Sequence, residues 1–112
     1  MSNLTVLTDE NSQEFVEKNQ QAGKLLVIDC YADWCGPCQM YAPVFEEVSS
    51  EYSSESSIEF VKANADYAPW VLQSFWVRGI PTTVILKDNK IVFNQSWIIP
   101  GKDLKEVIES LK

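Results

Sequence analysis

Apolar positions in this chain form two kinds of pattern, short continuous runs and stripes that repeat at every helical turn. Leu25–Tyr31 is a run of strand length, interrupted by one acid, and it predicts a strand buried on both faces of a sheet. Ile58–Asn64 and Thr82–Lys87 are also predicted strands, whereas Lys102–Leu111 carries its apolar residues on one stripe and predicts an amphipathic helix. Strands that alternate with helices predict an α/β fold.

The remaining segments extend this alternation to the order βαβαβαββα. Thr8 or Asp9 can cap a helix that runs to about Ala22. Gly23 is typical of the end of such a helix. We expect a mixed central sheet of about five strands, with a parallel core and an antiparallel C-terminal hairpin, covered by four helices on both faces. The other predicted elements are the strands Leu4–Leu7 and Ile91–Gln95, the turn Asp88-Asn89-Lys90 between the last two strands, and helices from Cys35 to about Tyr52 and over Pro69–Phe75.

Length and composition predict a single domain over residues 1–112. The chain has 112 residues, of which 46% are hydrophobic, and this is enough for one core; it shows no repeat and no linker. No apolar run approaches the length of a membrane span, and the first residues do not resemble a signal peptide, so we expect a cytoplasmic protein that does not bind membranes. The net charge of −7 argues against nucleic acid as a partner.

Three cysteines and no histidine limit the chemistry that is available. Three cysteines are too few for the disulfide framework of a secreted scaffold, and a Cys-x-x-Cys in a reducing cytoplasm is more often catalytic than structural. The lack of histidine removes Cys–His catalysis and most zinc sites, so we expect no metal. Cys30 follows Asp29 along a strand and points to the opposite face, where the expected role is that of a small buried apolar residue.

The motif Trp34-Cys35-Gly36-Pro37-Cys38 lies between a predicted strand and a predicted helix. Two thiols three residues apart across a helix start share one face and are close enough to form a disulfide. The first thiol lies at the helix N-terminus, where unpaired amides and the helix dipole favour the thiolate. Gly36 permits a close approach, and Pro37 fits the first turn of a helix. The motif therefore predicts reversible thiol–disulfide exchange.

Further residues match one family in their order and spacing. The matching residues are Asp29, Trp34-Cys35-Gly36-Pro37-Cys38, Ala42-Pro43, Lys62, Asp66 and Arg78-Gly79-Ile80-Pro81-Thr82. With these residues the chain resembles the thioredoxin family over nearly its whole length. The resemblance implies that Cys35 is the attacking thiolate, Cys38 the resolving thiol and Pro81 the cis-proline beside the disulfide. It also implies a monomer that reduces protein disulfides without a bound cofactor and is recharged by an NADPH- and FAD-dependent thioredoxin reductase.

Asp29 is the candidate base for the resolving thiol because it interrupts an apolar strand. Burial there would raise its pKa toward neutrality, and Lys62 on the next strand could be its buried partner. In the alternative interpretation, Asp29 faces solvent at the strand end and the Lys62 side chain extends to the surface. Periodicity alone does not separate the two, and the resemblance favours the catalytic interpretation.

The resemblance also predicts a substrate groove around Pro81. The backbone of Ile80 would pair with an extended substrate segment, and Trp34 would join Ile80 in an apolar floor. Trp97 stands close to where the family has a groove glycine, and Gly79 and Trp76 are further candidates for the groove. The alternative for Pro81 is an ordinary loop proline, and the alternative for each tryptophan is a place in the core or over a helix end.

The sequence also departs from the family pattern near the motif. Tyr31 replaces a common tryptophan, Gln39 replaces a usual cation, and Asn89 replaces a turn glycine but can adopt its left-handed conformation. Gln39 weakens the positive field beside Cys35.

Three other functions remain to be weighed. A disulfide isomerase or oxidase shares this fold, but such domains commonly carry histidine between the cysteines and follow signal peptides. A thioredoxin-like binding or scaffold subunit does not need either cysteine, and both are present in the motif. A structural zinc site lacks ligands, because Cys35 and Cys38 supply only two and Cys30 lies on a buried strand.

Overall fold

A computed structural model describes residues 4–112, and it confirms the mixed α/β sheet. The strands lie in the order β1-β3-β2-β4-β5. β1 and β2 both run parallel to β3, whereas β4 is antiparallel to β2 and β5 is antiparallel to β4. The parallel core and the antiparallel C-terminal hairpin are therefore both present. The strands are β1 (Thr5–Leu7), β2 (Leu25–Tyr31), β3 (Ile58–Asn64), β4 (Thr82–Lys87) and β5 (Lys90–Ser96).

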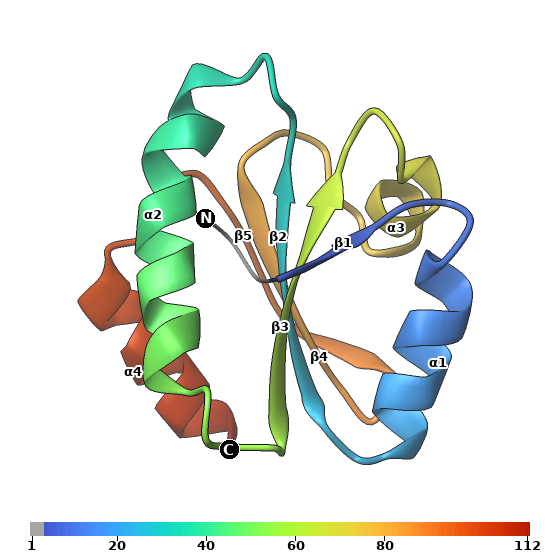
Figure 1. Cartoon of the computed structure of the whole chain (residues 1–112), viewed down its shortest axis with the longest axis vertical. Coiled ribbons are helices and arrows are strands. Elements are labelled where there is room, and N and C mark those ends of the chain that lie inside the picture. The colour runs from blue at the N-terminus through green and yellow to red at the C-terminus, as the bar shows by residue number, and fades with distance from the viewer. Residues whose placement is uncertain (1–3) are drawn as a thin grey trace.

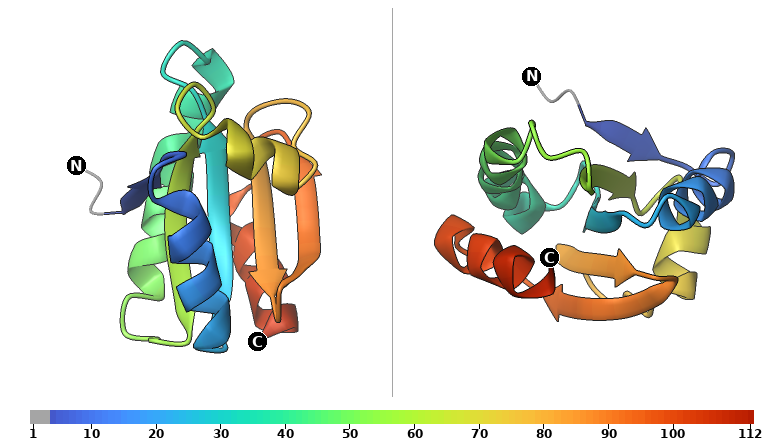
Figure 2. Two further views of the ribbon diagram at one scale, coloured as in Figure 1. Left: turned by 90° about the vertical axis from the view of Figure 1, so that its right-hand side faces the viewer. Right: turned by 90° about the horizontal axis from the view of Figure 1, so that it is seen from below.

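Across residues 4–112, four helices cover the two faces of this sheet. α2 and α4 lie on one face and α1 and α3 on the other (Figure 1), and the layers are also visible from below in Figure 2. The helices are α1 (Ser12–Gln21), α2 (Gly36–Glu51), α3 (Pro69–Ser74) and α4 (Gly101–Leu111). No helix among residues 4–112 is long and apolar enough to cross a membrane.

β2 contributes to both hydrophobic cores because its side chains alternate between the two faces of the sheet. Val27 packs in the cluster beneath α2 and α4, and Ile28 packs in the cluster beneath α1 and α3. Full burial of each such side chain contributes about 1.5–3 kcal/mol to stability. Cys30 belongs to the second cluster and is fully buried, as predicted. Asp29 is therefore held on a strand that is anchored on both sides.

The start of α1 differs from the prediction. The helix begins at Ser12 and its N-cap residue is Asn11, so the prediction of a cap at Thr8 or Asp9 is wrong. The Asp9 carboxylate instead accepts a hydrogen bond of 2.9 Å from the backbone N–H of Trp70, in the first turn of α3. Asp9 thus caps a helix that is distant in sequence.

The C-terminal hairpin has a tighter turn than the three residues predicted. Lys87 pairs directly with Lys90, so that only Asp88 and Asn89 lie in the turn. Both residues have a left-handed backbone conformation, with φ of 53° and 64°, as a two-residue type I′ turn requires. The left-handed conformation expected of Asn89 is confirmed, and β5 gains one residue at each end relative to the prediction.

Several elements meet at one end of the sheet. β2 ends at Tyr31, and α2 begins shortly afterwards at Gly36 (upper end in Figure 1). Because β4 is antiparallel to β2, its first residue, Thr82, pairs with Cys30 at this same end. The bond between Ile80 and Pro81, just before β4, is cis. The fold therefore brings the cysteine motif and the segment around Pro81 together.

Candidate active site

The Cys35–Cys38 pair forms a disulfide at the N-terminus of α2, with its Cα atoms 5.2 Å apart. Cys35 is the N-cap residue of the helix, and its Sγ accepts a hydrogen bond of 3.2 Å from the backbone N–H of Cys38. Gly36 is the first helical residue and Pro37 the second, where the missing N–H of proline costs no helical hydrogen bond. A backbone amide therefore points at the sulfur that would carry negative charge when the pair opens.

The segment before β4 lies against this disulfide. The Sγ of Cys35 lies 3.9 Å from the carbonyl oxygen of Ile80, and the Ile80 side chain packs against the small cluster that contains both cysteines. The Thr82 hydroxyl donates a hydrogen bond of 2.6 Å to the Gly79 carbonyl, which closes this segment on itself. The structure thus brings Gly79, Ile80 and Pro81 together with the cysteine pair.

Trp34 borders the pair on the exposed side. Its indole Nε1 donates hydrogen bonds of 3.1 and 3.3 Å to the two carboxylate oxygens of Asp66, and 71% of the residue is exposed. The Asp66 backbone N–H in turn binds the Asn64 side chain at 3.0 Å. The indole is therefore oriented by a carboxylate at the end of β3 and still presents most of its surface to solvent.

Asp29 lies on β2 near this end of the sheet, and its side chain is buried. It is 0% exposed, and within residues 4–112 neither of its carboxylate oxygens accepts a hydrogen bond. Burial raises its pKa to about 7; the cation of Lys62 opposes this rise and the anion of Glu46 adds to it. The interpretation in which Asp29 faces solvent is wrong, because the carboxylate lies under α2 and not at an open strand end.

Lys62 is paired with Asp29 across the parallel β2–β3 register. Its Nζ lies 4.0 Å from Asp29 Oδ2, 3.7 Å from Glu46 Oε2 and 4.5 Å from the centre of the Tyr31 ring. The residue is only 8% exposed, so the interpretation in which its side chain extends to solvent is also wrong. Sequence reasoning missed Glu46, since nothing in the sequence distinguishes it from the adjacent Glu47.

A hollow of about 180 Å³ extends from Cys38 to this buried lysine. Both Cys38 and Lys62 line it, together with Tyr31, Ala32, Asp33, Gln39 and Ala42. The Gln39 side chain, at a position where the family usually has a cation, donates a hydrogen bond of 2.8 Å to the Asp33 carbonyl. Asp29 does not line this hollow, but Lys62, which does, lies 4.0 Å from its carboxylate.

Trp76 and Trp97 have left-handed backbones, with φ of 61° and 87°. Bulky side chains rarely adopt this conformation, which suits glycine. The two residues are 69% and 60% exposed, so the alternative of a place in the core is wrong for both. The backbone N–H of Trp97 donates a hydrogen bond of 2.7 Å to the Pro81 carbonyl, which joins the Trp97 backbone to the segment beside the disulfide. Trp76 is instead tied to β5, whose Asn94 side chain binds its carbonyl at 3.4 Å.

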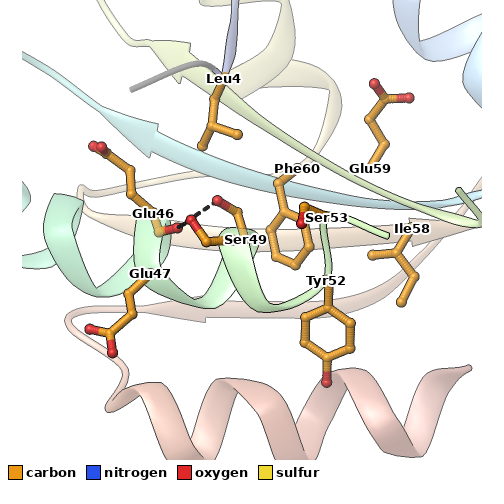
Figure 3. Close-up of a pocket in the computed structure, with 10 residues that line it drawn as sticks. Leu4, Glu46, Glu47, Ser49, Tyr52, Ser53, Ile58, Glu59 and Phe60 are labelled. Carbon is orange, nitrogen blue, oxygen red and sulfur yellow. Dashed lines mark hydrogen bonds between the residues drawn. The ribbon is translucent and has the colours of Figure 1, made fainter. Parts of the chain in front are cut away.

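A larger hollow, of about 410 Å³, lies between α2 and the edge of β3 (Figure 3). Tyr52 and Phe60 form part of its wall, and Glu46 and Glu47 project from α2 at one side. Neither cysteine of the disulfide lines this hollow, so it is not the redox site. Over the part of the chain that the structure describes, no group of three acidic or cysteine side chains could hold a metal ion.

Comparison with known proteins identifies the family. The family model described as Thioredoxin matches residues 3–110. The chain is 39% identical over 106 residues to Thioredoxin of Staphylococcus saprophyticus, covering 95% of both proteins. It is 34% identical over 110 residues to Thioredoxin 1 of Synechococcus elongatus, covering 97% of both.

Two further matches are to a longer protein and to a solved structure. The chain is 37% identical over 95 residues to the peptide-N(4)-(N-acetyl-beta-glucosaminyl)asparagine amidase of Caenorhabditis elegans, covering 85% of this chain and 14% of that longer protein. A structure solved in a study of thiol resolution in yeast mitochondrial 1-Cys peroxiredoxin by the glutathione and thioredoxin systems matches with a TM-score of 0.80 and 30% identity, covering 96% of this chain and 95% of that one. The predicted resemblance is confirmed: the chain belongs to the thioredoxin family, and it is a thiol–disulfide oxidoreductase whose redox pair is Cys35–Cys38.

Proposed function

We propose that the chain reduces protein disulfides in two steps, in which Cys35 attacks, Cys38 resolves and Asp29 accepts the proton of the resolving thiol. The observation that carries this proposal is the position of the Cys35–Cys38 disulfide at a helix N-terminus, with a buried acid whose pKa is raised to about 7 under the same end of the sheet. A group with a pKa near neutrality can both take up and release a proton at physiological pH.

In the first step, the Cys35 thiolate attacks one sulfur of the substrate disulfide. A mixed disulfide forms, the substrate S–S bond breaks, and the leaving sulfur departs as a thiolate that takes a proton from water. The Cys38 N–H that lies 3.2 Å from Cys35 Sγ supports the attacking thiolate. Cys35 is the cysteine that faces Ile80, so a substrate can approach it from this side.

In the second step, Cys38 loses its proton and attacks Cys35 in the mixed disulfide. The internal disulfide forms and the second substrate sulfur leaves as a thiolate that takes a proton from water, so that two electrons pass from the chain to the substrate. Asp29 would accept the Cys38 proton, directly or through a water in the hollow that Cys38 and Lys62 line. We expect Asp29→Ala to slow release of the mixed disulfide while the fold stays intact.

Substrates would bind as an extended segment across the residues before β4. The backbone of Ile80 would pair with the substrate, as an added strand does, and Trp34 and Ile80 would contact its apolar side chains. Gly79, Trp76 and Trp97 would border this groove. Support comes from the hydrogen bond between Trp97 and Pro81 and from the exposure of Trp34, Trp76 and Trp97.

Electrons for the next cycle would come from an NADPH- and FAD-dependent thioredoxin reductase, as for the family in general. The two sulfurs carry both electrons, so the domain would need no bound cofactor of its own. We place this cycle in the reducing cytoplasm, and we expect the chain to act there as a monomer.

The direct test is reduction of insulin disulfides with dithiothreitol as the electron donor. The chain should accelerate insulin precipitation over dithiothreitol alone, and the Cys35→Ser, Cys38→Ser double variant should lose this acceleration. Cys30→Ser is the matched control, because Cys30 is buried on the opposite face of β2 and should not affect the rate. Equal rates with and without the native chain would refute the proposal.

The reduction potential separates this function from that of an isomerase. A value near −270 mV is typical of a reductant of this family, whereas a value near −180 mV is typical of protein disulfide isomerase. Equilibration of the Cys35–Cys38 pair with glutathione buffers would measure it.

A further inference from the structure

We propose that Glu46 is a positioning residue for the resolving step, because it shares the Lys62 ammonium with Asp29 and so keeps the buried acid able to exchange a proton. This inference rests on the proposed role of Asp29 as the base for Cys38. Glu46 itself lies outside the cysteine motif, on the third turn of α2, and it would act only through Lys62 and Asp29.

The ammonium of Lys62 lies between two carboxylates. Its Nζ is 3.7 Å from Glu46 Oε2 and 4.0 Å from Asp29 Oδ2, and both distances exceed the 2.7–2.9 Å typical of a charge-assisted hydrogen bond. The Tyr31 ring, whose centre lies 4.5 Å away, also attracts this cation. The Lys62 ammonium thus interacts with three neighbours and makes a close contact with none of them. It therefore stabilises the Asp29 carboxylate only in part.

The three charged groups differ in their access to water. The side chains of Asp29 and Lys62 are 1% and 10% exposed, whereas that of Glu46 is 30% exposed. Glu46 lies at the border of the 410 Å³ hollow and can be solvated there. An anion that keeps its own hydration can draw the lysine away from the buried acid at small cost, whereas the buried acid has no such solvation.

The other groups around Asp29 carry no competing charge at neutral pH. On β2, Tyr31 lies two residues away and Cys30 points to the opposite face; the Cys30 thiol and the Tyr31 hydroxyl both have a raised pKa, chiefly because of burial. On α2, the Tyr41 hydroxyl pairs with Thr83 of β4 at 2.7 Å, its pKa is also raised chiefly by burial, and Cys38 is in the disulfide. Lys62 and Glu46 are therefore the charged groups that set the behaviour of Asp29.

Neutralising Glu46 acts on Asp29 in one direction by two routes. The ammonium is released to approach Asp29, and the repulsion between the two carboxylates disappears. Both changes favour the Asp29 carboxylate, so its pKa should fall below about 7. The acid limb of the pH profile for mixed-disulfide resolution should then move to lower pH by the same amount.

The experiment compares Glu46→Gln with Glu47→Gln in the oxidised protein, following the Asp29 carboxyl carbon by NMR as pH is changed. Glu47 is the matched control, because it is the next residue of α2 and lines the same hollow, and no ion pair links it to Lys62. We expect Glu46→Gln to lower the Asp29 midpoint by about one pH unit and Glu47→Gln to leave it in place. Glu46→Asp keeps the charge and should stay close to the native midpoint.

A second background isolates the route through the lysine. In Lys62→Met, where no ammonium is shared, Glu46→Gln should shift the Asp29 midpoint by less than half as much as in the native chain. An equal shift in both backgrounds, or equal midpoints for the Glu46→Gln and Glu47→Gln variants, would overturn the inference. This readout needs no turnover, so an Asp29 titration that responds to Glu46 in a chain that fails to reduce insulin would refute the proposed function and leave the electrostatic coupling standing.

Discussion

Two lysines in this molecule, Lys62 and Lys112, each lie beside two carboxylates, and they differ in almost every other respect. Lys112 lies at the C-terminal end of α4, with its Nζ 3.2 Å from Glu55 and 3.2 Å from Glu109. Its side chain is 35% exposed, and those of its partners are 37% and 55% exposed. Lys62 has longer contacts, of 3.7 and 4.0 Å, and the side chains of Lys62 and Asp29 are only 10% and 1% exposed.

The comparison shows that burial, more than contact length, decides what a charge does. At the exposed cluster, water and salt screen each charge, so short ion pairs contribute little to stability. At the buried cluster, Asp29 has lost its hydration and gained no hydrogen bond among the described residues, and its pKa rises to about 7 although a lysine is nearby. The pKa of Glu109 changes in the opposite direction: a hydrogen bond from Tyr52 lowers it most, and one from Lys112 lowers it further.

The largest effect should come from removing the buried acid. The folded-state pKa of Asp29, about 7, exceeds its ordinary value of 3.8, so the native state holds the proton more tightly; the stability from this proton is complete below pH 3.8 and is lost as pH rises through 7. This rise in pKa corresponds to roughly 4 kcal/mol as an upper bound. Asp29→Ala should therefore unfold at higher urea concentration than the native chain at pH 8.5.

The same pair of proteins supplies the control for this prediction. At pH 5 the native carboxyl is protonated, so the advantage of Asp29→Ala should largely disappear. A variant that is equally stabilised at both pH values, or destabilised at pH 8.5, would show that ionisation of Asp29 does not cost the native state stability.

The next effect should come from Lys62→Met. Loss of the cation removes the interaction that lowers the pKa of Asp29, so the midpoint should rise above 7 by about one unit. Resolution of a mixed disulfide, followed by stopped-flow fluorescence across the pH range, should need a correspondingly higher pH to reach half of its maximal rate. A profile that stays in place or moves to lower pH would remove Lys62 from the control of Asp29.

The smallest effect should come from Lys112→Met at the exposed cluster. Its contacts are shorter than those of Lys62, but water and salt screen them. We therefore expect the urea midpoint of the variant to match that of the native chain, and any small difference between them to decrease at high salt. The pH profile of disulfide resolution should also be unchanged. If Lys112→Met destabilised the chain as strongly as Asp29→Ala stabilises it, contact length would matter more than burial.

Much of the fold could be predicted from sequence because the strongest signals are local. The apolar runs of β2 and β3 and the stripe of α4 give their elements nearly the correct bounds. The start of α1 could not be predicted in this way, because the Asp9 side chain hydrogen-bonds to the first turn of α3, far away in the sequence. A capping residue looks the same in sequence whichever helix it caps.

The active site shows a similar division. The cysteine pair follows from a contiguous motif, and burial of Asp29 is one of two interpretations that periodicity allows. The sharing of Lys62 by Asp29 and Glu46 depends on how α2 packs over β3, which no local pattern encodes. The left-handed backbone of Trp76 could not be predicted, because tryptophan is not a residue from which a positive φ is expected; for Trp97 the one signal is its place close to a family glycine.

The most direct measurement is a carbon-detected NMR titration of Asp29 and Glu109 in the same sample of oxidised native protein. The account predicts that Asp29 titrates near pH 7 and that Glu109 titrates below the ordinary 4.5 of a glutamate. An Asp29 midpoint near 4, like that of an exposed aspartate, would contradict the claim that burial keeps this acid ready to exchange a proton with the resolving thiol.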